Sequence, residues 1–166
     1  MVLDTRIAEP YCFQFGQWQV RFYFDKKIVT RYRVNPSLVA PWFVALGAIA
    51  AFIGVGAGAF GAHALREALT PDLMRSYQTA VHDQLVHALG LVAVGVCERV
   101  FGGSTLMKLS GLMMLLGLVL FCGSLYVLTL TSFRQVGLIT PLGGIAFLVG
   151  WLCLAVGVVW RRRAQG

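Results

Sequence analysis

The chain alternates between long apolar runs and short polar segments. Residues 34–65 carry no charge, and two further uncharged runs extend from residue 109 to 133 and from 135 to 160. An α-helix rises about 1.5 Å per residue, so roughly 20 apolar residues cross the ~30 Å hydrocarbon core of a bilayer. The pattern therefore predicts membrane-spanning helices at residues 38–62, 109–131 and 141–160.

A shorter apolar run at residues 84–101 is predicted to be the second span. Only 14 uncharged residues separate Asp83 from Glu98, and runs of this length are more often buried or re-entrant. Apolar residues continue on both sides, however, and the Glu98 and Arg99 side chains are long enough to extend to the interface. We therefore predict an all-α integral membrane protein, with a four-helix transmembrane bundle in residues 38–166. The pattern leaves open whether the second span crosses completely.

Two Thr-Pro pairs are typical of helix starts. Thr70 and Pro71 fit the N-cap and the first helical position, and Asp72 then lies near the positive end of the helix dipole. A helix that begins there can run into the second span, with its amphipathic early part at the outer interface. Thr140 and Pro141 repeat the pattern at the start of the last span.

Basic residues set the predicted orientation. The net charge is +7, but only 13% of the 166 residues are charged, against about 25% in soluble domains. With four spans, eleven of the 14 basic residues fall on the side that holds both termini. The positive-inside rule then predicts that both termini are cytoplasmic. Because the basic residues flank apolar spans, we expect the bilayer rather than a nucleic acid as the partner of this chain.

Glycines repeat on one face of the first and the last predicted span. The positions are Gly47, Gly54, Gly58 and Gly61 in the first span and Gly143, Gly150 and Gly157 in the last. Helices in lipid associate by close packing, so small residues mark their interfaces. We predict that both helices pack tightly, with each other as the first candidate partners. The alternative is that glycine is simply common in membrane helices.

The sequence lacks a recognisable set of catalytic or metal-binding residues. Its four cysteines are well separated, and three of them lie in apolar runs, where a thiol behaves as a small apolar group. Motifs typical of serine hydrolases, zinc proteases and phosphate-binding loops are absent from the sequence, and no carboxylates are spaced as an acid–base pair. We therefore expect no enzymatic activity, no catalytic residues, no metal and no cofactor.

Four separated stretches become recognisable when they are read together. They are GAFGAHAL at 58–65, TPDLMRSYQTAVHDQLVHALGL at 70–91, FCGSLYVLTL at 121–130 and ITPLGGIAFLVGWL at 139–152. Together they resemble the family of small membrane proteins known as domain of unknown function 423, with YgdD-like and transmembrane protein 256-like members. The resemblance covers roughly residues 43–160. It implies a four-helix protein of the bacterial inner membrane, or of mitochondria in eukaryotes, and no particular reaction. In the family the segment before the second histidine usually reads YQxYHA, whereas Asp83 and Val86 stand here where tyrosines are usual.

In the predicted topology these stretches meet at the outer end of the bundle, where polar residues gather. The candidate polar cluster comprises His63, Tyr77, Gln78, Asp83, Gln84, His87, Ser124, Tyr126 and Thr140. His87 is the central candidate, because it lies about one turn inside the outer interface, where polar groups usually face the protein interior. Asp83, four residues earlier on the same helix, can orient its ring. His63 can approach from the first span, whereas His82 points elsewhere.

Three functions are compatible with this cluster. The favoured one is structural: hydrogen bonds between helices hold the outer ends together, and the chain is a structural or accessory component of a membrane assembly. It would then associate with a membrane-protein partner or with copies of itself. The second is a cofactor-binding redox subunit, in which His63 and His87 ligate a haem or line a quinone site. The third is translocation of a small solute or proton through an outer-side cavity.

Residues 1–37 are predicted to form a separate cytoplasmic extension without a counterpart in the family. In WQVRFYF at 18–24, apolar and polar residues alternate as in a half-buried strand, and a lone strand needs a partner. Four alternatives are open: a cytoplasmic hairpin, a partner-binding segment, a disordered tail, or a chain start placed too early. The last arises because family members tend to begin near Val34.

Overall fold

A computed structural model describes residues 8–15, 18–25, 40–131 and 133–165 of the chain. The chain divides into two compact units, Met1–Val34 and Asn35–Gly166. The domain boundary predicted from the sequence, at residue 37, lies three residues beyond this division.

The N-terminal unit contains a two-stranded antiparallel hairpin. Strand β1 spans Ala8–Phe15 and strand β2 spans Trp18–Asp25. Their register runs from the pair Ala8–Asp25 at the open end to the pair Phe15–Trp18 beside the turn. The described residues thus form a hairpin, whereas its cytoplasmic location and the partner-binding alternative stay predictions.

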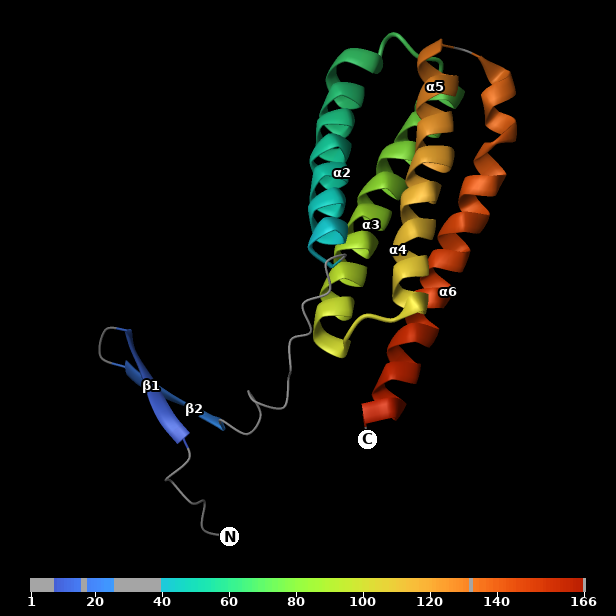
Figure 1. Cartoon of the computed structure of the whole chain (residues 1–166). Coiled ribbons are helices and arrows are strands. Elements are labelled where there is room, and N and C mark those ends of the chain that lie inside the picture. Colours follow the sequence, from blue (N-terminus) through green and yellow to red (C-terminus); the bar gives the residue numbers. More distant parts are fainter. Residues whose placement is uncertain (1–7, 16–17, 26–39, 132, 166) are drawn as a thin grey trace. The chain divides into compact units, whose positions relative to one another are not determined.

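The larger unit is a bundle of helices that run alternately up and down (Figure 1). In chain order its elements are α2 (Ala40–Phe60), a π-helical turn η2 (Gly61–Leu65), α3 (Pro71–Phe101), α4 (Thr105–Gly117), a second π-helical turn η3 (Leu118–Cys122), α5 (Gly123–Thr131), a short 3-10 helix η4 (Arg134–Leu138) and α6 (Thr140–Gln165). The start of α2, the α3–α4 connection and the end of α6 lie at one end of the bundle, here termed the inner end. The η2–α3 and η4–α6 connections lie at the other, the outer end.

Four helical segments of this unit are long and apolar enough to cross a membrane. They are Pro41–Leu65, Pro71–Phe101, Thr105–Thr131 and Gln135–Arg161, where residues 38–62, 84–101, 109–131 and 141–160 were predicted. The largest difference concerns the second span, because α3 has 31 residues, a length of about 46 Å. The Thr70 hydroxyl accepts a bond from the backbone N–H of Leu73, which confirms the predicted cap. α3 therefore begins at this cap and continues into the second span, as the Thr-Pro pair predicted, and the residues outside the predicted span 84–101 are its polar first turns.

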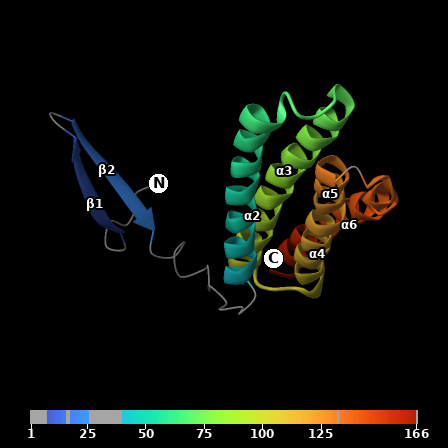
Figure 2. The same ribbon diagram turned by 90° about the horizontal axis from the view of Figure 1, so that it is seen from above.

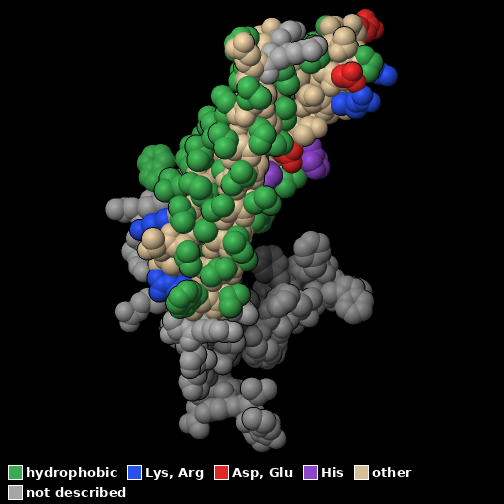
Figure 3. Space-filling view, turned by 90° about the vertical axis from the view of Figure 1, so that its right-hand side faces the viewer, with side chains coloured by type: hydrophobic (Ala, Val, Ile, Leu, Met, Phe, Trp, Pro, Cys, Tyr) green, Lys and Arg blue, Asp and Glu red, His purple; other side chains and the backbone are tan. Residues whose placement is uncertain are grey.

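The outside of the bundle is apolar along most of its length. Large side chains of all four spans are exposed, among them Phe52 at 80%, Leu148 at 71% and Trp160 at 68%. Figure 3 shows such side chains covering the visible face, with charged side chains mainly towards its two ends. A soluble protein does not leave so much contiguous apolar area in water, so lipid is the medium that covers it.

The two glycine-bearing helices do not pack on each other. α2 packs chiefly on α3, and α6 packs chiefly on α4, so the pairing of first and last span expected from the sequence is wrong. In Figures 1 and 2, α2 and the first half of α6 lie on opposite sides of the bundle, with the other helices between them. A glycine stripe shows that one face is closely packed, but it carries no information about which helix supplies the contact.

All seven glycines of the two stripes lie against a neighbouring helix. A Cβ atom built on Gly47 would lie 2.7 Å from the Ala88 carbonyl oxygen of α3, and one on Gly150 would lie 3.0 Å from Met114 of α4. The remaining five meet side chains or backbone of the same two neighbours or of η3: Gly54, Gly58, Gly61, Gly143 and Gly157. These contacts bring the helix axes close together, as packing in lipid requires.

Aromatic rings fill the space above three further glycines that the stripe analysis did not include. The Phe43 ring lies over Gly111, the Phe147 ring over Gly117 and the Trp151 ring over Gly90, each close enough to exclude a methyl group. Phe43 joins Leu91, Val94, Met114 and Leu154 in the buried core. The glycines of α3 and α4 were overlooked because they do not repeat at heptad spacing.

Candidate functional site

Three hydrogen bonds join α3 to α2 and α5 between the middle of the bundle and its outer end. Tyr77 donates its hydroxyl hydrogen to the carbonyl oxygen of Ala57 at 2.8 Å, and the Gln84 amide donates to that of Ala50, also at 2.8 Å. Tyr126 donates to the side-chain oxygen of Gln84 at 2.7 Å. We call Tyr77, Gln84 and Tyr126 the polar bridge. Two of its bonds end on helix carbonyls, whose second lone pair remains available in a helix.

The geometry of α2 makes the polar bridge possible. Tyr77 and Gln84 are seven residues apart, so they lie on the same face of α3. A Cβ atom on Gly61 would lie 2.5 Å from the Tyr77 ring, and one on Gly54 would lie 3.5 Å from the Gln84 amide carbon. Glycine at these positions therefore lets the two polar side chains reach the α2 backbone. The rings of Tyr77 and Tyr126 pack edge to face, with their centroids 5.3 Å apart.

A second polar contact joins α5 to the start of α6. The hydroxyl oxygens of Ser124 and Thr140 are 2.7 Å apart, and Ser124 also lies 2.9 Å from the carbonyl oxygen of Phe121. Thr140 is the first residue of α6 rather than the residue before it, because the 3-10 helix η4 already leads the chain into this turn. The predicted cap position is therefore shifted, and the Thr140 hydroxyl contacts α5.

His87 faces α6 rather than α2. Its Nδ1 atom is 2.7 Å from the backbone carbonyl oxygen of Asp83. Its ring stacks on that of Phe147, with centroids 3.4 Å apart and planes at 13°, and Trp151 lies at 6.2 Å. The bond from the ring thus goes to the backbone of Asp83. The sequence had suggested the Asp83 carboxylate instead. Side chains in a helix lean towards the N-terminus, and this brings the ring over the preceding turn.

The predicted approach of His63 to His87 is wrong. His63 is exposed in the π-helical turn η2, and the described residues show no contact between the two histidines. On α3, positions 77, 84 and 88 face α2, whereas positions 87 and 90 face α6. His87 therefore presents its ring to a different neighbour. Of the remaining candidates, Gln78 is exposed and Asp83 is half-buried.

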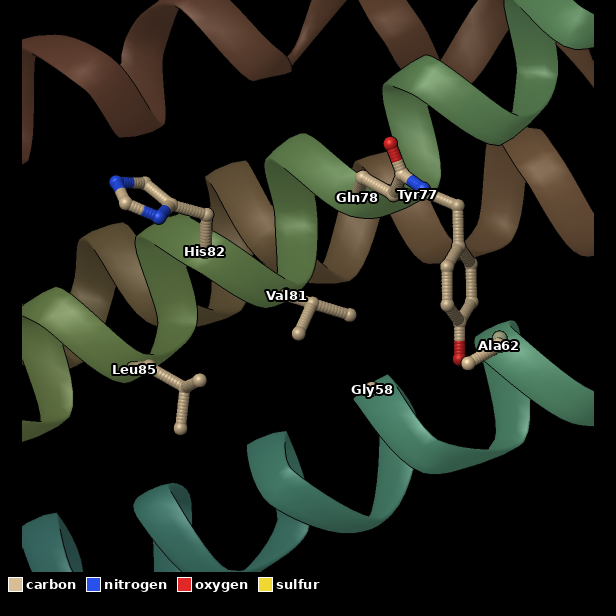
Figure 4. A pocket seen from close by; sticks show the side chains of 8 residues that line it. Gly58, Ala62, Tyr77, Gln78, Val81, His82 and Leu85 are labelled. Atoms are coloured by element: carbon tan, nitrogen blue, oxygen red, sulfur yellow. The ribbon is translucent and has the colours of Figure 1, made fainter.

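A shallow pocket of about 260 Å³ lies between α2 and α3. Its lining residues are Gly58, Gly61, Ala62, Tyr77, Gln78, Val81, His82 and Leu85. Figure 4 shows that Val81 and Leu85 point towards α2, whereas His82 and Gln78 point away from it. The floor of the pocket is therefore apolar and lacks the convergent polar groups that fix a polar ligand. In the described part of the chain, no three His, Cys, Asp or Glu residues are placed to hold a metal ion.

Ser110 and Arg161, which were not in the predicted cluster, also make polar contacts between separate elements. Ser110 is completely buried and donates to the Gly150 carbonyl oxygen at 2.7 Å, which links α4 to α6. At the inner end, Arg161 donates to the carbonyl oxygen of Gly103. A serine inside an apolar run is an available signal for such a contact, since Ser and Thr often bond across membrane helices.

Four candidate spans, an apolar outer surface and polar contacts between the helices define a small multi-pass membrane protein. The chain belongs to the family described as "Protein of unknown function (DUF423)", whose model matches residues 57–144. This confirms the resemblance found in the sequence and the predicted fold class. The matched region contains the three residues of the polar bridge and the Ser124–Thr140 contact, whereas Ala50, which accepts from Gln84, precedes it.

Curated relatives agree with this assignment. A UPF0382 membrane protein of Staphylococcus saprophyticus is 43% identical over 117 residues, which is 69% of this chain and 94% of the relative. YwdK of Bacillus subtilis, another UPF0382 membrane protein, is 41% identical over 70% of this chain and 95% of its own length. The UPF0382 inner membrane protein YgdD of Escherichia coli is 36% identical over 76% and 95%. No solved structure matches the chain.

Proposed function

We propose that the chain is a structural or accessory component of a bacterial inner membrane, with both termini on the cytoplasmic side. In this function the outer-end polar residues fasten helices together and do not bind a ligand. The observation that carries the proposal is the Gln84 amide, whose donor and acceptor are both engaged inside the protein, with Ala50 and Tyr126. Gln84 is also buried, and the two bonds hold its amide between α2 and α5, so the amide does not face a ligand cavity.

The surroundings of Gln84 support the same function. Ligand sites need unengaged polar groups that converge on a cavity, whereas the pocket between α2 and α3 has an apolar floor. His87 stacks on Phe147, and it has no second histidine beside it with which to ligate a haem. An assembly role also suits the apolar surface, which offers the faces of all four spans to lipid or to a partner within the bilayer.

The proposed orientation and membrane rest on charge and on the relatives. Arg99, Lys108 and the arginines from Arg161 onward lie at or beyond the inner ends of the spans. Basic residues concentrate on the cytoplasmic side of membrane proteins, which makes the inner end cytoplasmic. The printed description of YgdD as an inner membrane protein supports the same membrane for this chain.

Replacing Gln84 by Leu is expected to destabilise the protein. The substitution removes two interhelical bonds and leaves the Tyr126 hydroxyl without its acceptor, so the free energy of unfolding should fall by about 1–2 kcal/mol. Tyr126→Phe should cost less. The double variant should lose about 0.5 kcal/mol less than the sum of the single losses, because both changes remove the same bond. Reversible unfolding in mixed micelles measures all three values.

Gln78→Leu is the matched control for this experiment. Gln78 is on the same helix and is exposed, so its replacement should change the free energy of unfolding by less than about 0.5 kcal/mol. Equal stability of the Gln84→Leu variant and the unchanged protein would contradict the fastening role.

Native mass spectrometry of the protein, extracted gently from its own membrane, tests the absence of a tight cofactor. The expected mass is that of the chain, a multiple of it, or the chain with a protein subunit. Tightly bound haem or quinone would instead add its own mass and survive transfer into the gas phase. Such an adduct would overturn the proposal and favour a redox subunit.

A further inference from the structure

The register of the N-terminal hairpin gathers aromatic residues on one face of the sheet. Tyr11 pairs with Phe22, Phe13 with Val20, and Phe15 with Trp18. Because successive residues of a strand alternate between its two faces, these six positions share a face, which we call the aromatic face. The Glu9–Phe24 pair continues it at the open end. The opposite face contains the pairs Pro10–Tyr23, Cys12–Arg21 and Gln14–Gln19.

A sheet of this size needs something to pack against. A two-stranded hairpin alone is at best marginally stable in water, and an apolar face normally has to be covered by a third element or a partner. The hairpin is a two-stranded sheet among the described residues. It also lies before the family-matched segment at residues 57–144. The family model therefore does not include the hairpin.

The chain itself holds the hairpin near a bilayer. Only 14 residues separate Asp25 from Ala40, where the first span begins. Even a fully extended linker of that length reaches no further than about 50 Å. A lipid surface is therefore always within reach of the hairpin, whereas a separate protein partner has to be supplied.

The composition of the hairpin suits that surface. Tryptophan and tyrosine concentrate at membrane–water interfaces, where an amphipathic ring lies among the headgroups. The first 33 residues contain six basic and three acidic residues, and basic segments beside a span are attracted to anionic lipid. We propose that the hairpin lies on the bilayer surface with its aromatic face towards the lipid. It then acts as an interfacial anchor that this chain adds to the family fold.

Fluorescence quenching by brominated lipid tests this proposal in the full-length chain. Trp42, Trp151 and Trp160 are replaced by Phe so that Trp18 is the single fluorophore. The protein is reconstituted in vesicles of phosphatidylcholine and phosphatidylglycerol, with bromines on the acyl carbons nearest the headgroup. We expect Trp18 emission to fall about twofold relative to unbrominated vesicles, since interfacial elements sit at this depth.

A tryptophan moved by one residue provides the control. In the same background, Trp18→Phe with Gln19→Trp places the fluorophore on the opposite face of the same strand, and its emission should change little. Equal quenching at both positions would overturn the proposal, and so would the absence of quenching at Trp18. Protection of Trp18 from aqueous iodide without lipid quenching would instead indicate a protein partner or a second copy. If the triple replacement unfolds the bundle, fluorine spectra of the otherwise unchanged chain labelled with fluorotryptophan, with a paramagnetic lipid, report the same contact.

Discussion

Replacing Gly143 by Ala is expected to disrupt the packing of α6 against the third span. A Cβ atom at this position would lie 2.4 Å from the backbone nitrogen of Phe121 and 2.8 Å from its Cα atom. Backbone in the middle of a helix cannot rotate away as a flexible side chain can, so one helix has to move. Overpacking of a well-packed interior usually costs 1–3 kcal/mol, and here we expect a loss of about 3 kcal/mol. Thermal unfolding in detergent micelles measures it.

The neighbouring glycine is the control for this substitution. A Cβ atom on Gly144 would meet only the Phe121 ring, at 3.8 Å, an ordinary van der Waals distance. Gly144→Ala should therefore change stability by less than about 0.5 kcal/mol. The Ser124–Thr140 contact lies at the same junction, so loss of close packing should also expose this end of α6 to proteolysis. Equal effects of the two substitutions would show that the close approach at Gly143 is not required.

The second large effect is expected at Gly47. A methyl group there would lie 2.7 Å from the carbonyl oxygen of Ala88 and 2.8 Å from a methyl carbon of Val92. Because α2 packs chiefly on α3, a displaced α2 has no other large interface to compensate. Gly47→Ala should lower the free energy of unfolding by about 2–3 kcal/mol. The same variant should expose α2 to cross-linking or proteolysis before the other helices.

Gly56, on the same helix, is the control, because its replacement by Ala is not expected to lower the free energy of unfolding. A Cβ atom there would have no neighbour within 4 Å, so Gly56→Ala adds helix propensity without a clash. The expected result is unchanged stability or a gain of up to about 1 kcal/mol. A loss at Gly56 as large as that at Gly47 would mean that glycine acts through backbone flexibility rather than through close packing.

The spans could be predicted from the sequence because lipid imposes a simple rule on it. A long uncharged run has to cross the bilayer as a helix, since the backbone must satisfy its own hydrogen bonds there. The start of α3 was predictable for a similar reason, because Thr70 and Pro71 form a recognisable cap. Its continuation into the second span was predicted from the same cap, whereas the apolar run alone marks only residues 84–101 of this helix.

The partner of each helix face could not be predicted. The stripes ending at Gly61 and Gly157 indicated tight packing. The first span packs on α3, however, and the last span packs on α4. The separation of His63 from His87 could not be predicted for the same reason, because the sequence does not show which helix each face of α3 contacts. Residues 84 and 87 are only three positions apart on α3, yet they face α2 and α6 respectively. A sequence gives the angle between two side chains on one helix, whereas the positions of the surrounding helices are set by packing among all of them.

The candidate polar cluster illustrates the same limit at the level of single bonds. Tyr77, Gln84 and Tyr126 were all selected because polar groups inside a span need partners. That Gln84 would bond to a main-chain carbonyl of α2 could not be deduced, because every helix residue offers such an acceptor. The buried Ser110 was not included because a single serine in an apolar run does not form a repeating pattern along the helix.

The π-helical turn η3 determines which side chains of α5 face the neighbouring helices. Buried residues in α4 recur every three or four positions up to Gly117, and the next fully buried residue is Cys122, five positions later. The wide turn thus absorbs one additional residue. Without this turn, everything beyond it would be rotated by about 100°, which would carry Ser124 away from Thr140 and Tyr126 away from Gln84. Both polar contacts of α5 therefore depend on a backbone irregularity within LVLFC, a segment without a single charged or amide side chain.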